Sequence, residues 1–112
     1  MATDNETTAG MVSRLSPRLT GQQRRHLRSL AHELKPIVLV GQRGINENLI
    51  DNFRAALLAH ELVKVKVHGG DGLVETAEVL HDETGAQLAQ QIGHMLVFYK
   101  PHPEEPEINL PS

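Results

Sequence analysis

The sequence predicts an α/β domain whose elements follow the order αβαβα, with one or two further strands at the end. The chain has 112 residues, a length that favours one domain around one hydrophobic core. Apolar residues recur at helical spacing in three segments, and short apolar runs rich in β-branched residues lie between them. Helices and strands that alternate in this way favour one mixed sheet with helices packed against it.

The first predicted helix begins at Thr20, which forms a capping box with Gln23 because each side chain can bind the backbone amide of the other residue. Since proline disfavours helical geometry in the residue before it, this helix is expected to end at Lys35 and Pro36. The expected buried stripe consists of Leu27, Leu30, Ala31 and Leu34.

A short strand is predicted at residues 37–40, whose unbroken apolar run favours burial on both faces. Residues 41–44 form the turn that follows it. A second helix then begins after Asn46, a favourable capping residue. Its buried face is expected to hold Leu49, Ile50, Phe53 and Leu57.

Residues 62–67 alternate between apolar and basic side chains, which predicts a strand with Lys64 and Lys66 on a solvated face. A third helix is predicted from about Val74 to a left-handed cap at Gly85. Residues 86–92 fit either a helix or a strand, and residues 95–99 predict a final strand.

Composition excludes several classes of protein. The absence of cysteine rules out disulfides, thiolate metal sites and cysteine nucleophiles, and it fits a reducing cytosol. No apolar run approaches the roughly 20 residues that a membrane-spanning helix needs. The only aromatic residues are Phe53, Phe98 and Tyr99, too few for a platform on which bases stack.

The net charge of −3 hides a division between the two halves of the chain. Residues 14–66 hold ten of the eleven lysines and arginines and four acids, whereas residues 67–112 hold one lysine and eight acids. Such asymmetry is typical of contact with a nucleic acid, but a merely solvated surface can have the same composition.

The turn Gly41-Gln42-Arg43-Gly44 is the first candidate site. Two glycines between a strand and a helix start let a phosphate backbone approach closely, and Arg43 can pair with a phosphate through two hydrogen bonds. The same G-x-x-G pattern contacts nucleic-acid backbone in KH domains. Two glycines in a tight turn are more often a plain turn than a binding site, so both interpretations stay open. The spacing is not that of a P-loop.

Basic residues on two other predicted elements could extend this site. They are Arg24, Arg25 and Arg28 on the first helix, and Lys64 and Lys66 on one face of a strand. A separate solvated face on each element is the alternative.

No pattern of catalytic or metal-binding residues is present. His32-Glu33 and His60-Glu61 each begin an H-E-x-x-H pattern, but Pro36 and Lys64 stand where the second histidine would be. No serine lies in a G-x-S-x-G motif. We therefore expect a protein that is not an enzyme and that has no cofactor, no metal and no small-molecule substrate.

The order of residues resembles the YhbY-type proteins, also called the CRM domain family. The resemblance rests on an A-H-x-L-K-P helix end at residues 31–36, the G-x-x-G turn, and H-E-L-V-K-V-K at residues 60–66. It continues through residues 83–86, 99–101 and 108–111, and it covers roughly residues 19–111.

The resemblance implies a fold similar to the C-terminal domain of a bacterial translation initiation factor. Residues 86–92 are then a strand, which gives a single-domain αβαβαββ order with a four-stranded mixed sheet. The implied organisation is a disordered leader (1–18), a CRM domain (19–100), and an extended C-terminal tail (101–112) that packs on or near the domain.

The resemblance also implies binding to RNA, expected to be ribosomal RNA of the large-subunit precursor, by a cytoplasmic monomer in a bacterium. The implied contacts are the turn at residues 41–44 and the nearby basic residues. Gln42 departs from the family, whose loops often carry a lysine at this position. The competing hypothesis is an adaptor that docks on a ribosomal protein, with RNA contact secondary.

Overall fold

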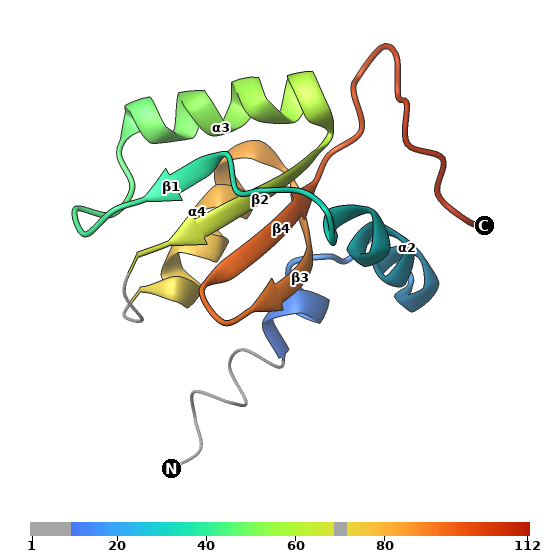
Figure 1. Ribbon diagram of the computed structural model, residues 1–112, viewed down its shortest axis with the longest axis horizontal. Coiled ribbons are helices and arrows are strands. Elements are labelled where there is room, and N and C mark those ends of the chain that lie inside the picture. Colours follow the sequence, from blue (N-terminus) through green and yellow to red (C-terminus); the bar gives the residue numbers. More distant parts are fainter. Residues whose placement is uncertain (1–9, 69–71) are drawn as a thin grey trace.

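The computed structural model describes residues 10–68 and 72–112, which form a four-stranded mixed sheet with helices on both faces (Figure 1). The α/β class and the αβαβαββ order are confirmed, and a short helical segment at residues 10–14 precedes them. The elements are α2 (Gly21–Ala31), β1 (Val38–Val40), α3 (Glu47–His60), β2 (Leu62–Val67), α4 (Leu73–Thr84), β3 (Gln87–Ile92) and β4 (Met95–Tyr99).

The strand order in the sheet is β1-β2-β4-β3, so β1 and β3 form the two edges. Strand β1 runs parallel to β2, with α3 as the connection between them, and β4 runs antiparallel to both β2 and β3. The segment at residues 86–92, ambiguous in its residue pattern, contains strand β3. Strand β3 is therefore the fourth strand that the family resemblance implied.

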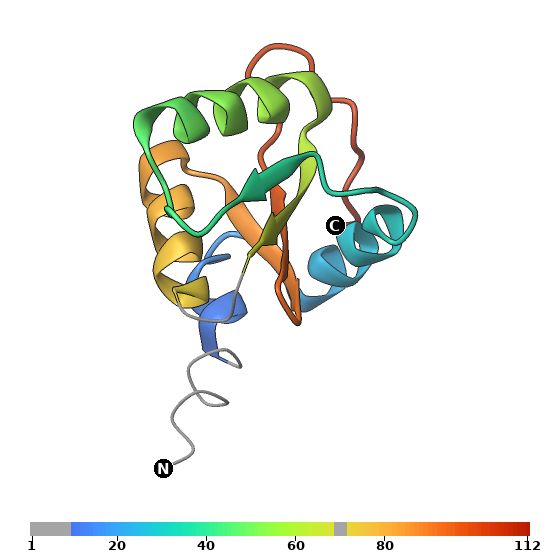
Figure 2. The ribbon, with the colours of Figure 1, turned by 60° about the vertical axis from the view of Figure 1, so that its left-hand side comes forward.

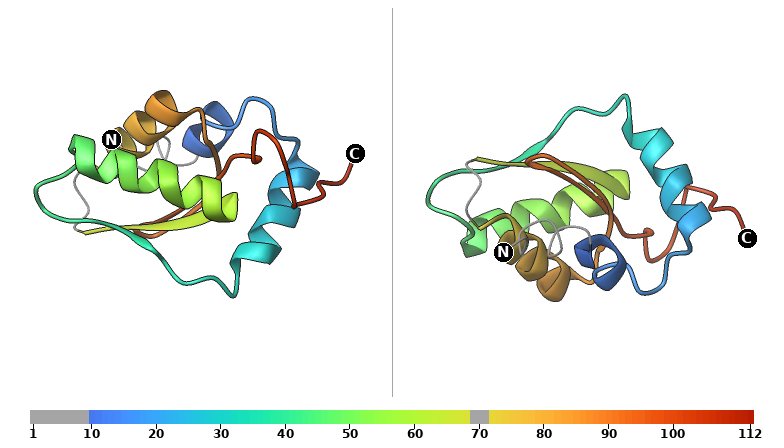
Figure 3. Two further views of the ribbon diagram at one scale, coloured as in Figure 1. Left: turned by 90° about the horizontal axis from the view of Figure 1, so that it is seen from above. Right: turned by 90° about the horizontal axis from the view of Figure 1, so that it is seen from below.

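One face of the sheet carries the main hydrophobic core. Helices α3 and α4 and the segment at residues 10–14 all lie on this face (Figure 3). Val63, Val65 and Val67 of β2 point into it, as the alternating pattern predicted. Phe53 of α3 and Phe98 of β4 meet there edge to face, with ring centroids 5.2 Å apart and no solvent exposure.

The segment before α2 differs from the expected leader. Residues 1–9 lie outside the described residues, but residues 10–18 belong to the folded domain. Met11 is fully buried and Leu15 is 4% exposed, and both pack in the main core. Arg14 forms an ion pair of 2.6 Å with Glu78 of α4. One helical turn with its apolar side chains on one face is enough to hold this segment, although its sequence is mostly polar.

Helix α2 packs on the opposite face of the sheet. Its predicted capping box is present: the Thr20 hydroxyl accepts the Gln23 amide, and the Gln23 side chain accepts the Thr20 amide, both at 3.0 Å. Leu27 and Ala31 are buried against Leu62, Val97 and other residues of the sheet.

The predicted end and buried stripe of this helix were partly wrong. The helix ends at Ala31, before the predicted Lys35 and Pro36. Leu30 and Leu34 are 41% and 39% exposed because α2 covers only one end of this face.

The burial predicted for residues 37–40 was also wrong on one face. Val38 and Val40 are buried in the main core, but Ile37 and Leu39 are 53% and 65% exposed. Strand β1 is an edge strand, and α2 does not extend over it. The apolar run therefore has one covered face and one open face.

The C-terminal tail is fixed to the domain by one buried carboxylate. Glu61, which is 4% exposed, accepts the backbone amides of His102, Ile108 and Glu107 at 2.7, 2.9 and 3.0 Å. Ile108 and Leu110 then pack beside α2, and Figure 2 shows the tail running from the end of α3 down to that helix.

These contacts set the ionisation of two side chains. Burial raises the pKa of the Glu61 carboxyl, but the three amides and the nearby His102 imidazole outweigh burial, so the pKa lies below its ordinary value. Burial raises the pKa of the Tyr99 hydroxyl, and the negative charge of Glu61 raises it further. Glu61 is therefore a charged group inside the fold at neutral pH.

Candidate nucleic-acid interface

The open face is the part of the sheet surface opposite α3 and α4 that α2 leaves uncovered. Lys64 and Lys66 of β2 point toward it, because the valines that alternate with them point into the main core. Lys66 lies between Leu39 of β1 and Met95 of β4 in the strand register. The prediction of a solvated face on β2 is confirmed, with Lys66 exposed and Lys64 half-buried.

At one end of the open face, residues 41–44 form a tight turn. The Gly44 amide donates to the Gly41 carbonyl at 3.0 Å, and Gly44 has a φ of +78°. Gly41, Gln42 and Arg43 are exposed. A left-handed backbone favours glycine at position 44, whereas the glycine at position 41 leaves open space around the chain.

The start of α3 adds little attraction for an anion at this turn. The Asn46 side chain accepts the Leu49 amide at 2.8 Å, and the negative charge of Glu47 lies in the first helical turn. Cationic side chains must therefore supply the attraction. Arg43 lies in the turn itself, and Lys66 and His68 line a hollow of about 320 Å³ that Gly41 borders. The Gln42 side chain lies 3.4 Å from the His68 ring nitrogen.

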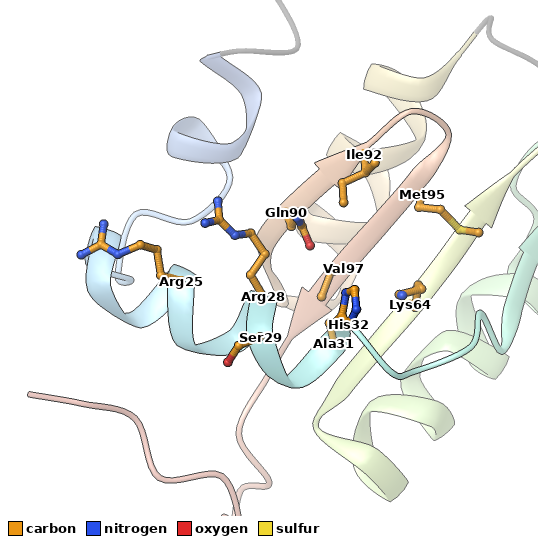
Figure 4. A pocket seen from close by; sticks show the side chains of 10 residues that line it. All are labelled: Arg25, Arg28, Ser29, Ala31, His32, Lys64, Gln90, Ile92, Met95 and Val97. Carbon is orange, nitrogen blue, oxygen red and sulfur yellow. The ribbon is translucent and has the colours of Figure 1, made fainter.

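A cleft of about 610 Å³ is lined by the last turns of α2 and by β2, β3 and β4 of the sheet. Arg28 of α2 and Gln90 of β3 both line it, and Figure 4 shows His32 and Lys64 reaching into the cleft from the end of α2 and from β2. The turn follows β1 at one edge of the sheet, whereas the cleft is lined by β3 and β4 on the other side of β2. Lys64 and Lys66, about 7 Å apart along β2, connect them.

The three arginines of α2 have different surroundings. Arg24 donates to the Leu19 carbonyl at 3.0 Å and to the Ser16 hydroxyl at 3.3 Å, so it ties α2 to the segment before it. Arg25 folds back toward Gly21 and points away from the sheet in Figure 4. Arg28 is directed into the cleft. The sequence pattern placed all three together, whereas in the structure Arg25 and Arg28 line the cleft and Arg24 is held by the segment before α2.

We define the basic strip as Arg43, Lys66, Lys64 and Arg28. Within residues 10–68 and 72–112, none of the four forms an ion pair with an acid. The acids of α3 and α4 lie instead on the other side of the sheet, where Glu78 pairs with Arg14, and Asp51 and Glu83 pair with Arg54. Helices α3 and α4 thus lie on one face of the sheet, and the basic strip lies on the opposite face.

The described part of the chain has neither a candidate metal site nor a candidate membrane-spanning helix. No three His, Asp or Glu side chains there gather in a way that could hold a metal ion. None of its helices combines the length and apolar character needed to cross a membrane.

The sequence model of the CRS1/YhbY (CRM) domain matches residues 19–100. The chain belongs to the CRS1/YhbY (CRM) domain family. Its resemblance to the probable RNA-binding protein YqeI of Bacillus subtilis reaches 44% identity over 95 residues, which is 83% of this chain and 99% of that protein. A Haemophilus influenzae protein named as an RNA-binding protein is 42% identical over 97 residues, covering 83% and 95% of the two chains.

A solved structure has the same fold as this CRM domain. The solution structure of SAV1595 from Staphylococcus aureus, a protein proposed to bind RNA, matches with a TM-score of 0.71 and 46% identity. The match covers 83% of this chain and 99% of that one. The mixed α/β fold and the family predicted from the sequence are therefore confirmed, while the likeness to an initiation-factor domain stays a prediction.

Sequence reasoning missed the cleft in this CRM domain. Gln90 lies in the segment that fitted either a helix or a strand, and His32 was considered only in an H-E-x-x-H pattern and in the helix-end motif of the family. These residues come together through the packing of α2 on the sheet, which no local spacing reveals. The weak signal available was the run of polar residues Gln87, Gln90 and Gln91 in β3.

Proposed function

We propose that this protein binds single-stranded RNA along the open face of its sheet, without a catalytic step. The observation that carries this proposal is the basic strip, whose four cations line one face with no acidic partner among the described residues. The names of the two bacterial relatives, both of which state RNA binding, support the same conclusion.

The turn at residues 41–44 contacts the sugar-phosphate backbone. Gly41 allows close approach because no side chain occupies the space beside it. The Arg43 guanidinium can donate two hydrogen bonds to one phosphate. Lys66 and Lys64 attract the following phosphates as point charges. Gln42 carries no charge, so attraction at this turn rests on Arg43 and Lys66.

Titration of a fluorescently labelled single-stranded RNA, followed by anisotropy, tests this function. With four phosphates neutralised, log K should fall with log salt at a slope of about −3. Arg43→Gln should weaken binding about tenfold, the worth of one charge-assisted hydrogen bond at the lower end of its range. Binding that hardly responds to salt would contradict the mechanism.

Arg54→Gln is the matched control, because it removes one charge from an exposed arginine on α3. Arg54 pairs with Asp51 at 3.4 Å and with Glu83 at 3.8 Å, far from the basic strip in the fold. Equal losses of affinity in the two variants would place the RNA on another surface.

We propose further that the RNA is ribosomal RNA of the large-subunit precursor, bound in the cytoplasm by a monomer. This step rests on the family's stand-alone bacterial members, with which the chain shares its motifs. Crosslinking in cells followed by sequencing of the bound RNA tests it. An adaptor that docks on a ribosomal protein would keep its partner after ribonuclease treatment, whereas an RNA-binding protein loses it.

A further inference from the structure

The cleft between α2 and the sheet has polar side chains that make no hydrogen bond or ion pair in the described part of the chain. Arg28, His32, Lys64 and Gln90 line it. Within residues 10–68 and 72–112, no hydrogen bond or ion pair involves these side chains. By contrast, the Ser29 hydroxyl at the rim already donates to the His26 carbonyl at 2.7 Å. These three basic groups and one amide thus line a space in which the described residues offer them no partner.

The floor of the same cleft is apolar. Val97 is 2% exposed and Ala31 is 1% exposed, while Met95 is half-buried and Ile92 is 60% exposed at the rim. An apolar floor with a few convergent polar groups is the usual composition of a small-ligand pocket, and the volume of about 610 Å³ lies within the range of such pockets. The cleft is therefore suited to a ligand with a flat apolar part and a polar rim.

The chemistry of the lining specifies that ligand. Arg28 and Lys64 would attract an anion, and the aliphatic floor would pack against an uncharged surface. The Gln90 carboxamide offers donors and an acceptor in one plane, which suits the edge of a base. A nucleotide carries all three features, whereas an acidic peptide side chain would leave the floor and the amide unused.

The position of the cleft connects it with the basic strip. Lys64 belongs both to the strip and to the cleft lining. A second hollow of about 520 Å³, which shares Arg25, Arg28 and Gln90 with the cleft, continues along α2. A polymer that enters from the turn at residues 41–44 can therefore pass through the cleft and leave beyond it.

We propose that the cleft is a pocket for one base of the bound RNA strand, which is turned out of the strand and held between α2 and β3. This inference rests on the proposed RNA-binding function and adds that the protein contacts a base as well as phosphates. The base lies on Met95 and Val97, Gln90 binds its edge, and Arg28 and Lys64 bind the flanking phosphates.

The test compares two oligonucleotides of about eight units, a site size usual for single-strand binding. One is an oligouridylate, and the other has the same phosphates and sugars but no bases. Wild-type protein should bind the abasic strand at least about fivefold more weakly, because it loses at least one hydrogen bond to a base edge, worth about 1 kcal/mol. Equal affinities, with Arg43→Gln still weakening both, would overturn the base pocket and leave the proposed function intact. Binding of neither strand would overturn both.

Two variants separate a base contact from the greater flexibility of an abasic strand. Gln90→Ala and Ile92→Ala should weaken binding of the oligouridylate and leave binding of the abasic strand unchanged. Their matched controls are Gln22→Ala, on an exposed position of α2, and Leu58→Ala, at a site 55% exposed on α3. If each variant affects both strands equally, the cleft holds only backbone or an acidic partner, and the inference fails.

Discussion

Replacing Glu61 by glutamine should detach the C-terminal tail and destabilise the protein. The two carboxylate oxygens divide their contacts, with Oε2 accepting the His102 amide and Oε1 accepting those of Glu107 and Ile108. The carboxamide of the Glu61→Gln variant would keep one acceptor oxygen for two amides. Its NH₂ group would then face the His102 amide, so that one donor meets another.

The expected cost follows from these contacts. One charge-assisted hydrogen bond is lost, worth about 1.5–3 kcal/mol, so the free energy of unfolding should fall by about 2 kcal/mol at neutral pH. For a domain of this size, such a loss lowers Tm by roughly 8 °C. Glu104→Gln is the matched control because it removes one charge from an exposed position of the same tail, and it should change Tm little.

The direction of the Glu61 pKa shift determines how the stability difference between wild type and Glu61→Gln should change with pH. The pKa of Glu61 is lowered in the folded protein, so its charged form stabilises the fold above the ordinary glutamate pKa. That contribution is lost as the pH falls through the lower, folded value. Urea unfolding at a series of pH values should therefore show the wild-type advantage over Glu61→Gln shrinking below about pH 4. An advantage that is absent at pH 7, or that persists undiminished in acid, would refute this account of the tail.

Three further outcomes are expected. In Glu61→Gln, the pKa of the sole tyrosine, Tyr99, should move down toward its ordinary value, because the negative charge that helps to raise it is gone. Ultraviolet absorbance titration measures this pKa. An unchanged pKa would show that burial alone raises it. Gly44→Ala should cost about 1 kcal/mol of stability because its φ is +78°, whereas Gly41→Ala should leave Tm unchanged and weaken RNA binding; a loss of Tm in Gly41→Ala would contradict the assignment. Phe53→Ala should lower the free energy of unfolding by about 3–5 kcal/mol in a denaturant titration, since the ring is fully buried against Phe98, and a loss below about 1 kcal/mol would mean that the core collapses around the cavity.

Much of the fold followed from local residue patterns. The capping box at Thr20, the alternation in residues 62–67 and the left-handed cap at Gly85 each have a local physical cause, and each is present in the structure. The exposure of Leu39 could not be predicted in the same way. Its exposure depends on where β1 lies in the sheet and on how far α2 extends, which are properties of the whole fold.

The candidate site was only partly predictable for the same reason. Lys64 and Lys66 share a face because side chains alternate along a strand, so sequence spacing was sufficient for them. Arg24 is adjacent to Arg25 in the sequence, yet it binds Ser16 and the Leu19 carbonyl, and neither contact has a signal in the helical pattern. The role of Gln90 depends on α2 crossing over the sheet.

The most direct test of the central claim is an NMR titration of the isotopically labelled protein with a single-stranded RNA. Binding on the open face predicts that the largest chemical-shift changes lie at residues 41–44, at Lys64 and Lys66, and at the side-chain amide of Gln90. Residues on the acidic faces of α3 and α4 should change little. Changes that concentrate on those helices, around Asp51 and Glu83, would contradict the assignment of the interface.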